Sequence, residues 1–140
     1  MNGMFLDRPL LDWLKAYTFP TERRFADSAY AEKVYPHVIG TTLANGTTTA
    51  SYFGTIYTDS SIVLAQQAEK QGQRAFIGKC NIDINTLDPS YTEASMQESY
   101  DETRRQIQAL TSMSSFKKLV EPIITPRVAF TCSISLLKGL

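Results

Sequence analysis

The feature of this sequence that most constrains its fold is a repeated alternation of helix-like segments with short apolar runs. The runs are rich in β-branched or aromatic residues and predict strands over residues 47–53, 74–79 and 120–126. A segment with helical periodicity precedes each run. Because a helix that joins two strands of one sheet makes a right-handed crossover and leaves the strands parallel, the alternation predicts an α/β fold.

The expected helices have recognisable ends. The first covers residues 27–43 and stops at an Asn-Gly pair, and the second runs from residue 58 to a glycine at 72, which suits a left-handed cap. The third begins with a capping box formed by Ser90 and Glu93. Five side chains at steps of three and four should share its buried face: Met96, Tyr100, Thr103, Ile107 and Leu110.

No linker, repeat or low-complexity tract divides the chain, so residues 1–140 are expected to form a single segment without a second domain. The stretch 10–25 is rich in Leu, Trp, Tyr, Phe and Pro and predicts a packed loop with one short helix. Pro36 lies inside the first helix, where it removes a backbone hydrogen bond and costs about 3 kcal/mol unless a kink accommodates it.

Composition excludes several classes of function. The 14 basic side chains balance the 14 acidic ones, so the chain lacks the positive charge with which proteins bind nucleic acid polymers or anionic membranes. Cys80 and Cys132 have no C-x-x-C spacing, which excludes a zinc finger and favours two reduced thiols in a cytosolic core. Residues 1–7 lack the pattern of a signal peptide, and no apolar run suits a membrane helix. The chain is therefore predicted to be cytoplasmic.

In parallel α/β folds, ligands bind at the carboxyl ends of the strands and in the loops that follow. Arg127 follows the third predicted strand, and the proline before it restricts its direction. Its guanidinium can donate paired hydrogen bonds to a carbonyl or a carboxylate, although a surface salt bridge explains its position equally well.

The other polar candidates have simpler explanations. Lys79 is expected to be a solvated residue past the end of a strand, and Asp59 a helix-capping carboxylate. Asp83 and Asp88 suit turns, and His37 is expected as a buried or half-buried ring on a helix face. No sequence motif of a nucleotide site, a hydrolase elbow or a zinc protease is present, so motifs alone assign no enzyme activity.

Several segments nevertheless resemble guanine deaminases of the amidohydrolase superfamily. The string D-R-P-L-L-D-W-L-K-A-Y-T-F-P-T-E-R-R-F at residues 7–25 is similar to the segment after the family's first barrel strand. N-G-T-T-T-A-S-Y-F at 45–53 with T-D-S-S at 58–61, and G-Q-R-A-F-I-G-K at 72–79, resemble the next two strand regions. I-T-P-R at 124–127 continues the match, which therefore covers nearly the whole chain.

The resemblance implies a partial (β/α)8 (TIM) barrel with about strands 2 to 4 and their helices. It also implies an enzyme that uses zinc to hydrolyse guanine to xanthine and ammonia, and a homo-oligomer when complete. The family's metal ligands and its proton-shuttling glutamate have no counterparts here, so the chain alone is expected to be inactive. By resemblance Arg127 binds the guanine carbonyl, and Val128 stands where the family usually has a phenylalanine that lines the base pocket.

Two further readings remain open from the sequence. The chain could be a truncated, non-catalytic product that associates with full-length subunits or other partners through unpaired strand edges. It could also be a segment of another amidohydrolase, such as an aminopyrimidine or triazine deaminase, which would share the N-G-T-T-T element but not the string at residues 10–25.

Overall fold

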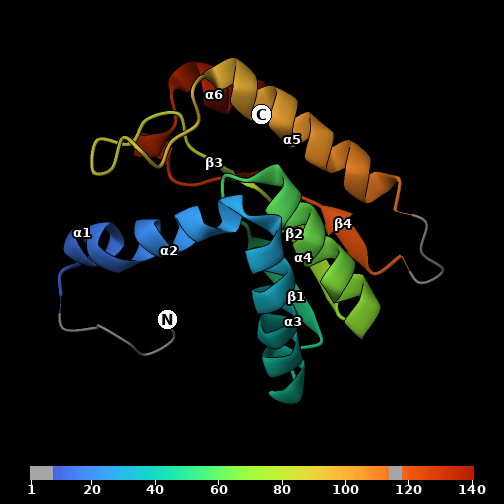
Figure 1. The fold of residues 1–140 in the computed structure, drawn as a ribbon. Coiled ribbons are helices and arrows are strands. Elements are labelled where there is room, and N and C mark those ends of the chain that lie inside the picture. Colours follow the sequence, from blue (N-terminus) through green and yellow to red (C-terminus); the bar gives the residue numbers. More distant parts are fainter. Residues whose placement is uncertain (1–7, 114–117) are drawn as a thin grey trace.

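A parallel three-stranded sheet with helices on one face forms the body of the molecule (Figure 1). The structure is a computed structural model and describes residues 8–113 and 118–140. Its helices are α1 (Leu10–Trp13), α2 (Phe19–Arg23), α3 (Ser28–Ala44), α4 (Thr58–Gln71), α5 (Met96–Thr111) and α6 (Ile134–Gly139). Its strands are β1 (Thr49–Phe53), β2 (Arg74–Gly78), β3 (Cys80–Asn81), β4 (Val120–Pro122) and β5 (Thr125–Pro126).

All of these strands pair in parallel, as the alternation predicts. The sheet order is β1-β2-β4, with Thr49 opposite Arg74 and Ala75 opposite Val120. Strands β3 and β5 form a separate two-stranded sheet. The prediction of one continuous strand over 120–126 is wrong, because this stretch is divided between the two sheets.

The core lies between the sheet and the helices α3, α4 and α5, which cover the same face. Strand β2 contributes its inward-facing side chains Ala75 and Ile77, both with no exposed surface. The buried residues that complete the cluster are Ala31, Tyr35, Ile39, Val63, Leu64, Ala65, Ala68 and Leu110. Removal of this apolar surface from water is the main stabilising contribution, at about 25 cal/mol per Å².

Helix ends agree in part with the sequence analysis. Gly72 takes φ 80° at the end of α4, and the Asn-Gly pair ends α3, as expected. The prediction that Ser90 and Glu93 form the capping box of α5 is wrong. Ser95 and Glu98 form it, since the Ser95 hydroxyl accepts the Glu98 N–H and the Glu98 carboxylate accepts the Ala94 N–H. The buried face of α5 is correspondingly rotated and consists of Ser99, Thr103, Gln106 and Leu110.

The prediction of a packed loop over residues 10–25 is wrong, since the stretch is almost entirely helical. A π-helical turn, Leu14–Thr18, lies between α1 and α2, and a 3-10 turn follows at Arg24–Ala26. Pro20 cannot donate to the carbonyl four residues earlier, and a widened turn before it lets the chain continue as a helix. Pro36 is likewise accommodated inside α3.

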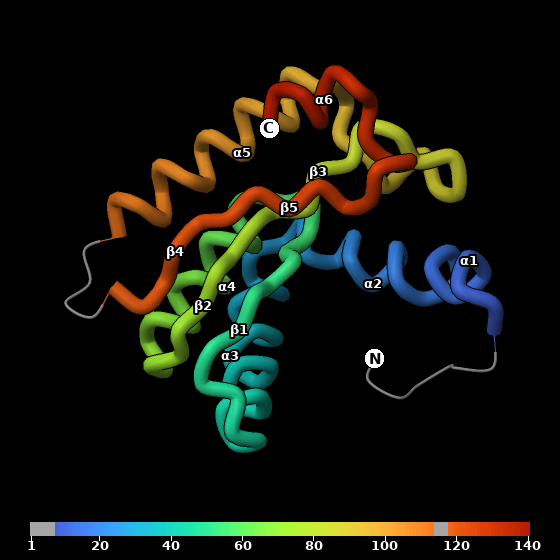
Figure 2. Tube along the Cα trace, turned by 180° about the vertical axis from the view of Figure 1, so that it is seen from behind, coloured from blue at the N-terminus to red at the C-terminus, as the bar shows by residue number. Residues whose placement is uncertain are grey.

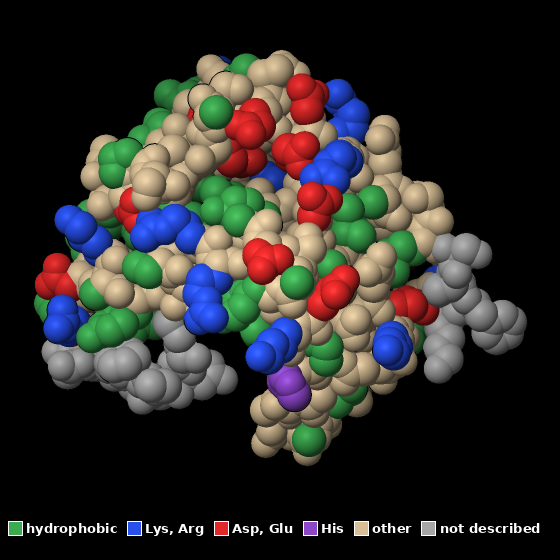
Figure 3. Space-filling model, in the orientation of Figure 1, with side chains coloured by type: hydrophobic (Ala, Val, Ile, Leu, Met, Phe, Trp, Pro, Cys, Tyr) green, Lys and Arg blue, Asp and Glu red, His purple; other side chains and the backbone are tan. Residues whose placement is uncertain are grey.

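No described helix covers the second face of the sheet (Figure 2). Alternate side chains of β1 and β2 point to that face, so Phe53 is 59% exposed and Phe76 is 39% exposed. On the helical side, by contrast, charged side chains of both signs are interspersed (Figure 3). The open sheet face thus exposes two large apolar side chains, one at the end of β1 and one in the middle of β2.

Among residues 8–113 and 118–140, no helix has the length and apolar character needed to cross a membrane. The prediction that the chain lacks a signal peptide falls on residues 1–7, which lie outside the described residues.

Candidate functional site

The segments that follow the three predicted strands, residues 54–55, 79–83 and 127, lie side by side. The Cys80 N–H donates to the Thr55 carbonyl at 2.9 Å, and the Arg127 N–H donates to the Asn81 carbonyl at 3.0 Å. These backbone bonds continue the parallel order of the strands past the ends of β1 and β2. The carboxyl ends of the strands, where parallel α/β folds bind their ligands, therefore lie together.

Gly78 allows this close approach. A Cβ at that position would lie 2.2 Å from Thr125 Oγ1 and 2.6 Å from the Ile123 carbonyl oxygen. Both distances are too short for real atoms, so any larger residue would push β2 away from the chain before β5. Gly78 therefore sets the short distance between β2 and the segment that leads to Arg127.

The Arg127 side chain is held between an acid and two aromatic rings. Its Nη1 donates to Glu22 Oε2 at 3.0 Å, and the two side chains are 18% and 23% exposed. The guanidinium carbon lies 5.1 Å from the Phe19 ring centroid and 6.0 Å from that of Tyr91. Cations are attracted to ring faces at such distances, so the group is restrained in its plane as well as in position.

These neighbours also shift acid–base equilibria. Burial by itself lowers the pKa of Arg127, but the Glu22 charge and the hydrogen bonds to Glu22 and Cys80 outweigh it and hold this pKa above its ordinary value. Burial raises the pKa of the Cys80 thiol to about 11, although Arg127 opposes the shift. Burial and then the Glu22 charge raise the pKa of Tyr91 above its usual range. Arg127 is therefore positively charged and lies beside a neutral Cys80 thiol and a neutral Tyr91 hydroxyl.

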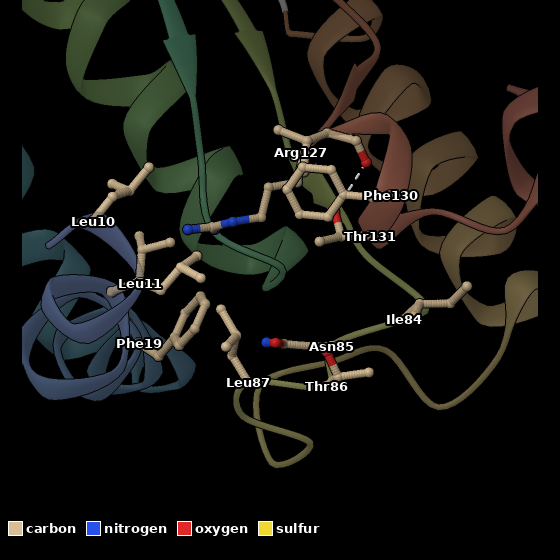
Figure 4. A pocket seen from close by; sticks show the side chains of 12 residues that line it. Leu10, Leu11, Phe19, Ile84, Asn85, Thr86, Leu87, Arg127, Phe130 and Thr131 are labelled. Carbon is tan, nitrogen blue, oxygen red and sulfur yellow. Dashed lines mark hydrogen bonds between the residues drawn. The ribbon is translucent and has the colours of Figure 1, made fainter.

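A largely apolar cavity of about 270 Å³ opens beside Arg127. The Arg127 side chain extends from the strand end towards Phe19 and Leu11 (Figure 4). The cavity lining consists of Leu10, Leu11, Leu14, Phe19, Ile84, Asn85, Thr86, Leu87, Arg127, Val128, Phe130 and Thr131. A concave apolar site with few convergent polar groups is the usual form of a small-ligand pocket. Both residues named for substrate binding from the sequence lie in its wall.

Lys79 is not the solvated residue that the sequence predicts. It is buried under α5 and pairs with Glu93, and both side chains are almost fully enclosed, at 0% and 4% exposed. The Glu93 carboxylate also accepts the Ile82 N–H at 2.9 Å, and Gln106 accepts the Lys79 N–H at 2.7 Å. A lysine that finds a carboxylate inside the core is no longer a solvated residue, and it does not line the cavity.

Two other expectations are corrected. His37 is exposed on α3 and not half-buried, because the buried face of that helix runs through Tyr35 and Ile39. Asp59 does not cap α4, whose N-cap residue Tyr57 makes no side-chain cap bond. The Asp59 carboxylate instead accepts from Arg105 Nη1 at 2.6 Å across to α5.

Asp88 has a local partner, as expected of a turn residue, whereas the bond of Asp83 goes to a distant residue. Asp88 accepts the Ser90 N–H at 3.1 Å and also pairs with Arg23 of α2. Asp83 accepts the Ser133 N–H at 2.7 Å at the start of α6. Both residues therefore tie the loop before α5 to distant parts of the chain.

The two thiols are both free and buried. Cys80 lies behind the guanidinium, with its Sγ 3.8 Å from Arg127 Nη1, and Cys132 donates to the Asn81 carbonyl at 3.3 Å. The prediction of unpaired thiols in a packed interior is confirmed.

The zinc ion implied by the resemblance needs several side-chain ligands that converge on one point. Among residues 8–113 and 118–140, no group of three or more His, Cys, Asp or Glu side chains is placed to hold an ion. The described residues therefore do not fit a catalytic zinc site, which needs three converging ligands and an open position. No chemical step is assigned to a metal in this part of the fold.

Sequence reasoning missed the partners of both basic side chains. Glu22 lies 105 positions from Arg127, and Tyr91 falls in an irregular loop. Glu93 had been assigned to a helix cap, which hid its pairing with Lys79. Phe19 and Glu22 do belong to the string at residues 7–25 on which the resemblance rests, and this was the one available signal.

Comparison with known proteins gives a match over the whole chain. The model of the amidohydrolase family matches residues 1–140. Guanine deaminase of Rattus norvegicus is 49% identical over 138 residues, which cover 99% of this chain and 30% of that protein. The chain thus spans about 30% of the length of such relatives.

Solved structures agree on the fold. The crystal structure of guanine deaminase from C. acetobutylicum with bound guanine in the active site superposes with a TM-score of 0.89 and 38% identity, over 98% of this chain and 32% of that one. The E. coli guanine deaminase gives a TM-score of 0.79 and 34% identity, over 91% and 28% of the two chains. The chain therefore has a partial (β/α)8 barrel fold and is similar to a segment of guanine deaminases.

Proposed function

We propose, since the chain belongs to the amidohydrolase family, that it forms the substrate-binding wall of a guanine deaminase. In this proposal residues 1–140 are a single segment of the catalytic barrel. The complete enzyme hydrolyses guanine, with water, to xanthine and ammonia, and it is a cytoplasmic homo-oligomer.

The observation that carries the proposal is Arg127. A guanidinium that is restrained by a carboxylate and two rings faces an apolar cavity, where it can donate hydrogen bonds to the carbonyl oxygen of a planar base. Hydrogen bonds from a charged donor are stronger in such a partly desolvated place than in water. Arg127 would therefore bind and orient guanine and would not itself perform the hydrolysis.

Val128 is the second proposed contact. It is 41% exposed and lies in the cavity wall beside Arg127. Its side chain offers the base an apolar surface but no ring on which to stack, which lowers the binding energy available from that position. The aromatic contacts of this pocket come instead from Phe19 and Phe130.

The proposed metal of the complete enzyme is zinc, whose chemistry there is the activation of a water molecule. Because the described residues do not fit such an ion, we assign its ligands to other parts of the complete enzyme. The chain by itself is accordingly proposed to be inactive.

A non-catalytic role through association is the second candidate, and the open sheet face favours it. Phe53 and Phe76 are large apolar side chains on a face that no described helix covers. Such surfaces associate in water. A monomeric and stable chain in sedimentation experiments would argue against this candidate.

The first test is kinetic. The whole chain replaces its matching segment in the rat guanine deaminase, and Arg127→Met removes the donors while it keeps an extended side chain. A buried hydrogen bond to a charged group contributes about 1.5–3 kcal/mol, so kcat/KM for guanine should fall roughly 10- to 200-fold. Zinc content should not change.

Arg104→Met is the matched control, because Arg104 is exposed on α5 and pairs only with Asp101 within the described residues. Its kcat/KM should equal that of the parent chimera. An Arg127→Met chimera with full zinc and unchanged guanine kinetics would contradict the proposal. An equal loss with an aminopyrimidine substrate would favour another amidohydrolase deaminase.

A further inference from the structure

We propose that Glu22 is the positioning residue of this site: it holds Arg127 by one nitrogen so that the remaining N–H groups stay directed at the ligand. The inference rests on the proposed function and names the residue on which its specificity depends. Glu22 itself does not line the cavity, whereas Arg127 does. Any effect of Glu22 on a ligand must therefore pass through the guanidinium.

The hydrogen bonds of Arg127 leave one edge of the guanidinium available. Within the described residues its side chain donates through Nη1 alone, to Glu22 Oε2 at 3.0 Å and towards Cys80 Sγ at 3.8 Å. Nε and Nη2 carry the donors of the opposite edge, which has the planar geometry for two parallel hydrogen bonds. The Glu22 carboxylate thus binds Nη1 and leaves the edge with Nε and Nη2 available to a ligand.

The aromatic rings fix the remaining degree of freedom. Phe19 and Tyr91 stack with centroids 5.4 Å apart, and the Arg127 guanidinium lies over both. A ring contact restrains the tilt of the guanidinium plane but permits rotation within that plane. The carboxylate of Glu22 stops this rotation, because it attaches to one defined nitrogen.

Glu22 is itself held in place. Its carboxylate interacts with the hydroxyl group of Tyr91, whose side chain is completely buried. The same hydroxyl accepts the Ile56 N–H at 3.4 Å, in the loop after β1. These contacts connect the loop after β1 to Arg127 through the side chains of Tyr91 and Glu22.

An exposed ion pair would not support this role, because solvent screens it and its side chains move freely. Here the carboxylate and guanidinium are about four-fifths enclosed. Glu22 also belongs to α2, so it fixes the strand-end arginine from the N-terminal helical stretch. Pre-organised donors of this kind cost the site no reorganisation when the ligand binds.

The first experiment reads the restraint directly and needs no activity. ¹⁵N spectra of the Arg127 side chain in the whole 140-residue chain report how fast the guanidinium rotates about its Nε–Cζ bond, with the signal assigned by its loss in Arg127→Met. Glu22→Gln keeps the shape but leaves a weaker, uncharged acceptor, and the rotation should become at least about tenfold faster.

Glu32→Gln is the matched control, since Glu32 is exposed on α3 and the substitution removes the same charge. It should leave the rotation unchanged. Equal rotation rates in the parent chain and in Glu22→Gln would overturn the proposal.

The second experiment is a double-mutant cycle in the chimera with rat guanine deaminase. Glu22→Gln should lower kcat/KM for guanine about tenfold in the parent, and it should have no further effect in the Arg127→Met background. Two losses that simply multiply would show that Glu22 acts independently of Arg127 and would overturn the proposal. If Arg127→Met alone leaves guanine kinetics unchanged, the proposed function fails, while the rotation measurement still decides whether Glu22 holds Arg127.

Discussion

Two pairs of a base and an acid stand at the strand ends of this molecule, and they differ in what surrounds them. Lys79 and Glu93 are enclosed under α5, whereas Arg127, which is held by Glu22, lines a cavity. The backbone N–H groups around the first pair are also satisfied, by Glu93 and Gln106. Similar charges therefore serve two purposes, since the enclosed pair can only stabilise the fold, and the pair at the cavity remains accessible to a ligand.

The largest expected effect on stability is that of Lys79→Met. This substitution leaves the Glu93 carboxylate uncompensated inside the core, which should lower the free energy of unfolding by about 3–5 kcal/mol. Urea unfolding of the chain measures the loss. Lys70→Met, an exposed lysine on α4, is the control and should change little.

A rescue variant sharpens this prediction. Adding Glu93→Gln removes the unpaired charge and keeps an oxygen for the Ile82 N–H, so much of the lost stability should return. If Lys79→Met is as stable as the parent, Lys79 and Glu93 are not an enclosed pair and the contrast with Arg127 fails.

The same substitution at the other pair should have a smaller effect on stability. Arg127→Met breaks an ion pair that is about four-fifths enclosed, so the loss should lie between the about 0–1 kcal/mol of exposed pairs and the about 3–5 kcal/mol of a fully buried one. The free energy of unfolding in urea should therefore fall by about 1–2 kcal/mol, less than in Lys79→Met, even though guanine turnover by the chimera falls. A loss as large as that of Lys79→Met would mean that Arg127 is primarily a structural residue.

The smallest expected effect concerns the thiol behind Arg127. The pKa of Cys80 is raised to about 11 from 9.0, so its thiolate fraction at pH 8 is roughly 100-fold lower than in an ordinary thiol. In a Cys132→Ser chain, alkylation by iodoacetamide should be slow at pH 8 and accelerate only as the pH approaches 11. Fast alkylation of the folded chain at pH 8 would show that the space behind the guanidinium is open to solvent.

Much of the architecture could be predicted from the sequence because it depends on local patterns. Periodicity identified α3, α4, β1 and β2, and Gly72 marked the end of a helix through its left-handed backbone. Local patterns failed where a distant partner decides. Residues 10–25 were predicted as a packed loop with one short helix from their richness in Leu, Trp, Tyr, Phe and Pro, although they are almost entirely helical. Glu93 was assigned to a capping box that Ser95 and Glu98 form instead.

The candidate site divides in the same way. The sequence by itself determined that Arg127 stands at the end of a strand, because the apolar, β-branched run and the proline before Arg127 are local features. The sequence left open whether Arg127 binds a ligand or forms a surface salt bridge. Only the tertiary structure distinguishes these two roles, since Glu22, Phe19 and the cavity come from parts of the chain far from Arg127. It also decided that Lys79 is buried, because the cost of desolvating a charge depends on whether the fold supplies an opposite charge, and no local pattern contains that information.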